Sequence, residues 1–251
     1  MPTAQKIAVV TGGSAGIGAA TVRRLAADGF RIITGARRVD RLERVIAGLD
    51  GAEARALDVT DPASIDRFAD GLDAVHLLVN NAGAALGVES VEGADEDKWE
   101  RMFELNVMGV LRVTKALLGA LRASGSGHVI NVGSIAGFET YPGGAGYTAS
   151  KHGLRALTRT LRKELLGEPI RVTEVAPGLV ETEFSIVRFD GDADRAKGVY
   201  DGMTPLTGED IADCIAWAAT RPPHVNIDEI LVRPLDQATA TMVHRRQDSG
   251  G

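Results

Sequence analysis

The sequence predicts an α/β fold in which a doubly wound, mostly parallel β-sheet of about seven strands carries helices on both faces. Two observations predict it. Short apolar runs without polar alternation, such as residues 7–10, are typical of strands buried on both faces of a parallel sheet. These runs alternate along the chain with longer amphipathic segments, and that alternation specifies a parallel sheet covered by helices. The 251 residues are enough for a single domain of this kind with a large core.

The expected elements follow one another in a regular order. Strands are expected at residues 7–10, 32–34, 54–57, 75–79, 128–132, 170–175 and 227–232. Helices are expected at 17–27, 40–49 and 95–121, from residue 61 onward, and from the segment around Tyr147 to about 166. Asp28-Gly29 is a usual signal for the end of a helix. Asp61-Pro62 is typical of a helix start, because Asp caps the first turn and Pro fits within it.

The C-terminal third departs from this regularity. Residues 184–205 follow the end of a strand, are rich in Asp and Gly, and are only weakly periodic. We therefore expect a mobile lid there. The folded domain is expected to span residues 1–237, and the tail, 238–251, to be partly disordered or to lie at an oligomer interface.

Composition and charge argue against several classes of protein. The net charge of −6 argues against a nucleic-acid-binding surface, which usually needs a basic face. Cys214 is the only cysteine, which excludes an intramolecular disulfide, and it is expected to pack as a small hydrophobe. The five histidines show no ligand-pair spacing, so no metal site is expected. No signal peptide is visible and the apolar runs are too short to span a bilayer, so a cytoplasmic location is expected.

Glycines gather directly after the first expected strand, in the segment TGGSAGIG from Thr11 to Gly18. Glycine there lets the backbone turn sharply and lets a diphosphate approach the N-terminus of the following helix. The segment lacks the Gly-Lys-Ser/Thr ending of a P-loop. A tight strand-to-helix turn also uses glycine for steric reasons alone. The position of the turn favours binding of a dinucleotide.

The end of the second expected strand indicates which dinucleotide binds. A site for NAD usually offers a carboxylate to the ribose hydroxyls about 20 residues after the glycines. Here no Asp or Glu occurs between Gly29 and Val39, and the strand instead runs into Arg37-Arg38. Arginine pairs well with a 2′-phosphate, which a carboxylate would repel. The sequence therefore predicts NADP(H), the alternative being two solvated arginines at the start of a helix.

Tyr147 and Lys151 are spaced to share one face of a helix. An unperturbed tyrosine has a pKa of about 10 and is a poor acid or base near neutrality. A neighbouring cation favours the phenolate and lowers that pKa, so the pair predicts proton transfer to or from a carbonyl or alcohol oxygen. The alternative is an ordinary surface pair, which a lone Tyr-x-x-x-Lys does not exclude.

With these residues in order, the chain resembles the short-chain dehydrogenase/reductase family, in its short single-domain branch, over nearly its full length. The matching features, in chain order, are the glycine turn 11–18, Asp58 after the third strand, the Asn-Asn-Ala-Gly segment 80–83, Asn106, Ser134, Tyr147, Lys151 and Pro177-Gly178.

The resemblance implies a Rossmann-type fold and reversible hydride transfer between NADP(H) and a secondary alcohol or its ketone. Tyr147 would exchange a proton with the substrate oxygen, and Lys151 would lower the tyrosine pKa and hold the nicotinamide ribose. Ser134 would hydrogen-bond the substrate oxygen, and Asn106 would anchor a water that relays protons from Lys151 to solvent. Taken alone, Ser134 is equally consistent with a turn cap and Asn106 with a packing residue. By the same resemblance the cofactor would contact Gly12, Ser14, Gly16, Ile17, Gly18, Arg37, Arg38, Asp58, Val59, Asn80, Ala82, Gly83, Tyr147, Lys151, Pro177, Gly178, Val180 and Thr182.

A narrower resemblance concerns the substrate. Residues 177–192 and the tail segment around Gln237 are similar to the NADP-dependent 3-hydroxy-acid dehydrogenases, a subgroup that includes serine 3-dehydrogenase and allo-threonine dehydrogenase. An acid substrate needs a partner for its carboxylate, and Arg188 on the expected lid is the candidate, unless it is a solvated loop arginine. Tyr141 and Phe138 are expected either to line the substrate pocket or simply to pack.

Other functions stay open at this point. A reductase of bulkier ketones is the alternative enzyme, since the Gly-rich segment 143–146 leaves room for a larger substrate. A cofactor-binding sensor without catalysis is a third reading, although both Tyr147 and Lys151 are present. The resemblance implies a homo-oligomer, commonly a tetramer formed through the helix after the fourth strand and the helix that bears Tyr147.

Overall fold

A seven-stranded, wholly parallel β-sheet forms the centre of the protein, in the order β3-β2-β1-β4-β5-β6-β7. The structure is a computed structural model and describes residues 5–246. Its strands are β1 (Ile7–Thr11), β2 (Arg31–Ala36), β3 (Glu53–Ala56), β4 (Leu77–Asn80), β5 (Gly127–Val132), β6 (Ile170–Pro177) and β7 (Glu229–Val232). The strand order reverses between β1 and β4, so a crevice opens at their carboxyl ends, where ligands bind in sheets of this type. The predicted fold class is confirmed.

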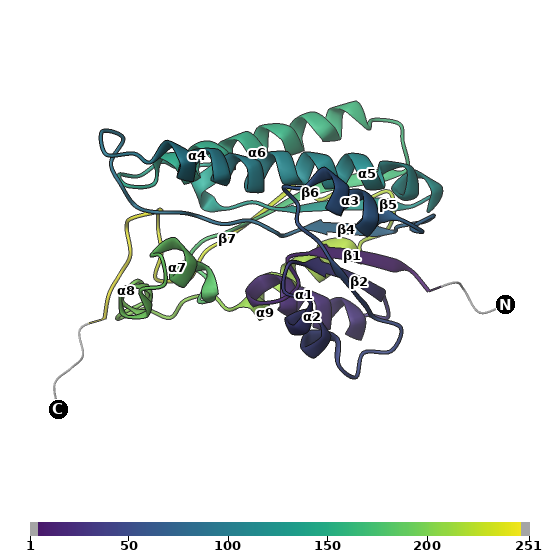
Figure 1. Ribbon diagram of the computed structural model, residues 1–251, viewed down its shortest axis with the longest axis horizontal. Coiled ribbons are helices and arrows are strands. Elements are labelled where there is room, and N and C mark those ends of the chain that lie inside the picture. Colours follow the sequence, from purple (N-terminus) through teal and green to yellow (C-terminus); the bar gives the residue numbers. More distant parts are fainter. Residues whose placement is uncertain (1–4, 247–251) are drawn as a thin grey trace.

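Helices cover both faces of the sheet (Figure 1). On one face lie α1 (Gly16–Ala27), α2 (Val39–Ile46) and α9 (Gly208–Ala219). On the other face lie α3 (Pro62–Ala69), α4 (Glu96–Phe103), α5 (Gly109–Ala123) and α6 (Ala145–Glu164). Successive residues of β2 point to opposite sides, so Ile32 joins the core beneath α1 and α9, while Ile33 joins the core beneath α3 and α5.

The single helix expected over 95–121 differs from the structure at its middle. A π-helical turn, Glu104–Met108, separates α4 from α5 without breaking the path of the chain. Asn106 lies in this turn, and its side chain is held by Ala84 and Ser150. π-Helical turns inside α-helices often mark functional sites, and apolar periodicity does not reveal them.

Further differences concern two strand ends and one additional helix. Strand β6 continues to Pro177, which pairs in register with Val232, whereas the sequence prediction ended the strand two residues earlier. Strand β7 begins at Glu229 rather than at residue 227. Helix α9 was not among the expected elements, although Thr207 and Asp210 form a capping box at its start that the sequence could have shown.

The expected lid contains two short helices, α7 (Glu183–Arg188) and α8 (Ala193–Gly198) (Figure 1). The tail returns across this region, because the backbone N–H of Arg246 donates to the carbonyl of Gly202 at 2.7 Å and the side chain of Arg245 donates to the carbonyl of Val199 at 3.1 Å. The described part of the tail therefore packs on the lid of its own chain. The disorder predicted for the end of the tail concerns residues 247–251, which lie outside the described residues, and the mobility of the lid stays a prediction.

Within residues 5–246, no helix combines the length and apolarity needed to cross a membrane. The same part of the chain contains no group of three or more His, Cys, Asp or Glu side chains arranged to hold a metal ion.

Candidate active site

A cavity of about 600 Å³ lies at the carboxyl ends of the strands. Its wall includes the glycine turn after β1, the ends of β4, β5 and β6, the lid helix α7, the residues Val199 and Tyr200 that follow α8, and part of the tail. This is the position that the crevice between β1 and β4 predicts for a ligand. Most of the residues proposed from the sequence line it.

The glycine turn has the backbone that only glycine adopts easily. Gly12 and Gly16 have φ values of 70° and 51°, in the left-handed region. Gly18 allows close packing, since a Cβ there would lie 2.2 Å from the carbonyl oxygen of Gly12. Gly12, Gly16 and Ile17 line the cavity, whereas Ser14 and Gly18 do not.

In the Asn-Asn-Ala-Gly segment, the two asparagines have structural contacts and the last two residues line the cavity. Asn81 donates its amide hydrogens to the carbonyls of Thr11 and Gly12, at 3.0 and 3.2 Å, and so ties the end of β4 to the glycine turn. Ala82 and Gly83 line the cavity. Asn80, expected to contact the cofactor, instead points into the protein and donates to Asn131 and Thr114. This position corrects the expectation that Asn80 contacts the cofactor. The alternation of side chains along β4 turns Asn80 away from the cavity.

The two arginines at the end of β2 are not equivalent. Arg38 forms an ion pair with Glu183 at 3.3 Å, and Arg41 forms a shorter one with the same carboxylate at 2.8 Å. Arg37 is exposed at the cavity and has no hydrogen-bond or ion-pair partner among the described residues. Asp58 and Val59 also line the cavity, and hydrogen bonds from Thr60, with a smaller effect of Arg37, hold the pKa of Asp58 below its ordinary value. The sequence did not reveal Glu183 as a partner of Arg38, because 145 residues separate them.

Tyr147, Lys151 and Ser134 meet at the inner end of the cavity. Tyr147 and Lys151 are 9% and 6% exposed, which rules out the surface-pair alternative. Nζ of Lys151 donates to the carbonyl of Val132 at 2.9 Å and lies 5.9 Å from the centroid of the Tyr147 ring. Ser134 follows β5 and also caps the short turn after it, since its Oγ accepts from the N–H of Ala136 at 3.1 Å. Ser134 can therefore cap the turn and still present its side chain to the cavity.

The electrostatics of Tyr147 differ from the expectation. Burial raises the pKa of Tyr147 above its ordinary value, and Tyr141 acts in the same direction. The side chain of Ser134 and the positive charge of Arg188 lower it. Burial also lowers the pKa of Lys151 to about 8, against an opposing effect of Glu174. In the protein alone the net shift of the Tyr147 pKa is therefore upward rather than downward as expected, because burial dominates.

Asn106 is fully buried and does not line the cavity. Its amide nitrogen donates to the carbonyl of Ala84 and to Oγ of Ser150, both at 2.9 Å, and its Oδ1 accepts from the N–H of Ala84 at 3.0 Å. A Cβ on Gly83 would lie 2.7 Å from this Oδ1 and 3.8 Å from Nζ of Lys151. Asn106 thus holds the backbone that passes directly beside Lys151, and its predicted water relay stays a prediction.

The lid supplies the opposite wall. Nη1 of Arg188 donates to the hydroxyl of Tyr141 at 3.1 Å, and both side chains line the cavity. The ring of Phe184 packs against Tyr147, with centroids 5.6 Å apart. Phe138 does not line the cavity; it stacks on Arg155, with 3.5 Å between the guanidinium carbon and the ring centroid. Pro177, Gly178, Val180 and Thr182 line the cavity between β6 and α7.

Gln237 is a cavity residue to which the sequence assigned no role. It is 4% exposed, and its Oε1 accepts from the N–H of Leu179 at 2.9 Å. A Cβ on Gly178 would lie 2.2 Å from that oxygen, so the side chain requires glycine there. In the sequence, the segment around Gln237 stood out only by resemblance, because the contact of Gln237 with Leu179 depends on the tail returning to β6.

Comparisons with known proteins agree with this geometry. The sequence model of the family described as short chain dehydrogenase matches residues 6–192. An uncharacterised oxidoreductase of Mycobacterium tuberculosis is 55% identical over 239 residues, covering 95% of each chain. Sulfoacetaldehyde reductase of Chromohalobacter salexigens is 42% identical, covering 91% of this chain and 94% of that protein. The NADP-dependent 3-hydroxy acid dehydrogenase of Salmonella typhi is 40% identical, covering 95% of this chain and 99% of that protein.

A solved structure is similar over nearly the whole chain. Serine dehydrogenase, in a closed form complexed with NADP⁺, superposes with a TM-score of 0.90 at 39% identity, covering 96% of this chain and 100% of that one.

Proposed function

Because this chain belongs to the short-chain dehydrogenase family, we propose that it is an NADP(H)-dependent oxidoreductase that interconverts a secondary alcohol and its ketone. The observation that carries the proposal is the cavity, which brings Tyr147 and Ser134 together at its inner end and has Arg37 at its rim. The similar serine dehydrogenase structure is described as complexed with NADP⁺, and the 3-hydroxy acid dehydrogenase as NADP-dependent.

The chain's own residues fit this cofactor. The turn of Gly12 and Gly16 leaves backbone space for a diphosphate next to α1. Arg37 is free to pair with a 2′-phosphate, and Arg38 would first have to leave Glu183. Lys151 is the candidate for holding the nicotinamide ribose. When bound, the cofactor supplies or accepts the hydride, and the protein supplies position and the proton.

The proton is assigned to Tyr147. Because burial raises its pKa, this phenol is protonated near neutral pH, which is the form that donates to a carbonyl oxygen. Ser134 would hold the same oxygen by a hydrogen bond and orient it. The lowered pKa of Lys151, about 8, leaves its ammonium largely charged at neutral pH, next to the site where negative charge develops on the oxygen.

We assign the substrate to the class of small acids. Arg188 and Tyr141 present a guanidinium and a hydroxyl to the cavity that contains Tyr147, a suitable pair for a carboxylate or sulfonate. The names of two relatives, a 3-hydroxy acid dehydrogenase and a sulfoacetaldehyde reductase, also denote anionic substrates. This guanidinium favours an acid over the bulkier neutral ketone considered above.

A homo-oligomer, in particular a tetramer, is part of the proposal. Trp99 and Phe103 of α4 are 36% and 46% exposed. They lie beside Gly146 and Gly153 of α6, so an apolar surface spans the two helices. Light scattering of the purified protein tests this, and a monomer would contradict it. The cytoplasmic location stays a prediction.

A substrate panel tests the function. The purified protein is mixed with NADPH or NADH and with 3-oxo acids, sulfoacetaldehyde or neutral ketones, and the fall in reduced cofactor is followed by absorbance. The reverse direction uses 3-hydroxy acids and hydroxy amino acids with NADP⁺. We expect turnover with NADPH and the acids. A protein that binds NADPH but turns over none of these would fit the sensor reading instead.

A further inference from the structure

Glu174 on β6 is a buried carboxyl group to which the function proposed above assigns no role. Its side chain is 0% exposed, and neither of its oxygens has a hydrogen-bond partner among the described residues. A glutamate is almost never fully buried unless it is paired, and each buried polar group without a partner needs a physical explanation. The explanation is found in the charges around it.

The carboxyl group lies against the turn that carries the reactive side chains. A Cβ on Gly133 would lie 2.2 Å from Oε1 of Glu174, so the carboxyl fills the space that a side chain at this position would take. Gly133 directly follows Val132, whose carbonyl binds Nζ of Lys151 at 2.9 Å, and directly precedes Ser134. Glu174 and Lys151 therefore reach the same short turn from two different elements.

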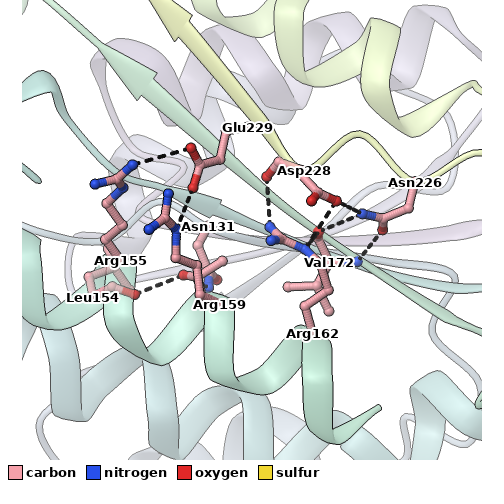
Figure 2. Close-up of polar contacts among 10 residues, drawn as sticks. Asn131, Leu154, Arg155, Arg159, Arg162, Val172, Asn226, Asp228 and Glu229 are labelled. Carbon is pink, nitrogen blue, oxygen red and sulfur yellow. Dashed lines mark hydrogen bonds and ion pairs between the residues drawn. The ribbon is translucent and has the colours of Figure 1, made fainter. Parts of the chain in front are cut away.

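Charged groups face Glu174 from two neighbouring elements. On β7, Glu229 pairs with it in the sheet register. Arg155 and Arg159 reach from α6 to Glu229, at 3.3 and 2.8 Å (Figure 2). On β5, its register partner is the neutral Asn131. Lys151 is the remaining cation that acts on it, also from α6.

Each of the two groups shifts the ionisation of the other. Burial and then Glu229 raise the pKa of Glu174 to about 7, and Lys151 is the first of the cations that oppose this. For Lys151, burial lowers the pKa to about 8, and Glu174 raises it. The neighbouring carboxylate, Glu229, is instead shared by Arg155 and Arg159.

We propose that Glu174 is a positioning residue that keeps Lys151 cationic and holds it at the Val132–Ser134 turn. It touches neither substrate nor cofactor, because it does not line the cavity. It acts from below the turn, by its negative charge and by filling the space beside Gly133. The consequence for catalysis rests on the function proposed above, whereas the electrostatic coupling of Glu174 and Lys151 belongs to the protein alone.

The direct test is the titration of Lys151 in the unliganded protein. The chain has six lysines, so the Cε signals of ¹³C-lysine-labelled protein are few, and Lys151→Met identifies the one that belongs to Lys151. Glu174→Gln keeps the shape and removes the charge. We expect it to lower the titration midpoint of Lys151 by about one pH unit or more, as loss of a nearby opposite charge does. An unchanged midpoint in a folded variant overturns the proposal.

Glu229→Gln is the matched control, since Glu229 is the neighbouring carboxylate and is engaged by Arg155 and Arg159. Removing it relieves the repulsion on Glu174, which then ionises at lower pH, so the midpoint of Lys151 should stay or rise. A fall as large as that in Glu174→Gln would assign the effect to general disturbance and overturn the proposal.

If Glu174→Gln fails to fold, a second measurement replaces the lysine titration. It follows the infrared band of the protonated Glu174 carboxyl group as the pH is raised. In Lys151→Met this band should disappear at a higher pH than in the unmodified protein, because a cation that favours ionised Glu174 is lost. Disappearance at the same pH in both proteins would overturn the proposal.

The catalytic consequence is measured separately. In Glu174→Gln, the alkaline limb of kcat/KM for NADPH-dependent reduction should move to lower pH, while the rate at mildly acid pH stays close to that of the unmodified protein. An equal loss at every pH indicates a merely structural residue and overturns the catalytic part. If the unmodified protein reduces no substrate, the proposed function fails, but the lysine titration still decides whether Glu174 holds Lys151.

Discussion

The guanidinium of Arg188 donates a hydrogen bond of 3.1 Å to the hydroxyl of Tyr141, across 47 residues of sequence. A second, longer bond of 3.4 Å runs from its Nε to the carbonyl of Gly87, so the lid is fastened to the loop after β4. While burial raises the pKa of Tyr147, the charge of Arg188 lowers it, so Arg188 is electrostatically part of the site. One arginine thus connects the lid, the substrate wall and the proton donor.

Arg188→Ala should impair acid substrates selectively. Loss of a hydrogen-bonded charge partner costs about 1.5–3 kcal/mol, so we expect KM for a 3-oxo acid to rise about tenfold to a hundredfold. KM for a neutral ketone should change little. Arg195→Ala is the matched control, because Arg195 also belongs to the lid but stacks on Phe189 and does not line the cavity. Equal effects on acid and neutral substrates would remove Arg188 from the substrate site.

Tyr147→Phe should remove most of the turnover but spare cofactor binding. The ring keeps its packing against Phe184, and only the hydroxyl that donates the proton is lost. General acid catalysis contributes about a hundredfold to ten-thousandfold, so kcat should fall by at least the lower figure. NADPH affinity, followed by quenching of tryptophan fluorescence, should remain within about threefold. Turnover at the original rate would disprove the role of Tyr147.

Arg37→Ala should weaken the preference for NADPH over NADH more than Arg38→Ala does. Arg37 has no ion-pair partner in the described part of the chain, whereas Arg38 is held by Glu183. We expect KM for NADPH to rise about tenfold or more in Arg37→Ala, with KM for NADH nearly constant. Steady-state kinetics with both cofactors measure this. A parallel rise for NADH would show that the arginine does not read the 2′-phosphate.

His128 should make stability dependent on pH. Burial, with a smaller effect of Arg171, lowers the pKa of His128 well below its ordinary value of 6.5. The unfolded chain therefore takes up a proton on this side chain as the pH falls through about 6.5, while the folded chain does not. The contribution of neutral His128 to stability is complete above that pH and is lost below it. Tm should therefore fall as the pH is lowered from about 7 to about 5.

The comparison variant is His128→Gln, which cannot titrate and can keep a bond to Thr173, now 2.7 Å from the histidine Nε2. Its Tm should vary less over the same interval, as measured by circular dichroism during heating. An identical pH dependence in both proteins would place the titrating group elsewhere.

Local patterns were enough for much of the fold. Apolar runs located seven strands near their observed positions, and Asp61-Pro62 marked the start of α3 correctly. The glycine turn was identified because left-handed backbone at Gly12 and Gly16 leaves a direct sign in the sequence. The family resemblance, confirmed by the comparisons, rested on motifs of this local kind.

What the sequence determined by itself is the order of strands and helices, the spacing of Tyr147 and Lys151, and the absence of a carboxylate at the end of β2. These depend on residues close together in the chain. Only the tertiary structure decided that Arg38 is engaged by Glu183, that Asn80 faces inward, and that burial raises the pKa of Tyr147. The position of the Glu174 carboxyl group next to Gly133 was likewise decided only by the tertiary structure. The physical reason is that burial and electrostatic coupling depend on which distant segments pack together, and a short window of sequence contains neither.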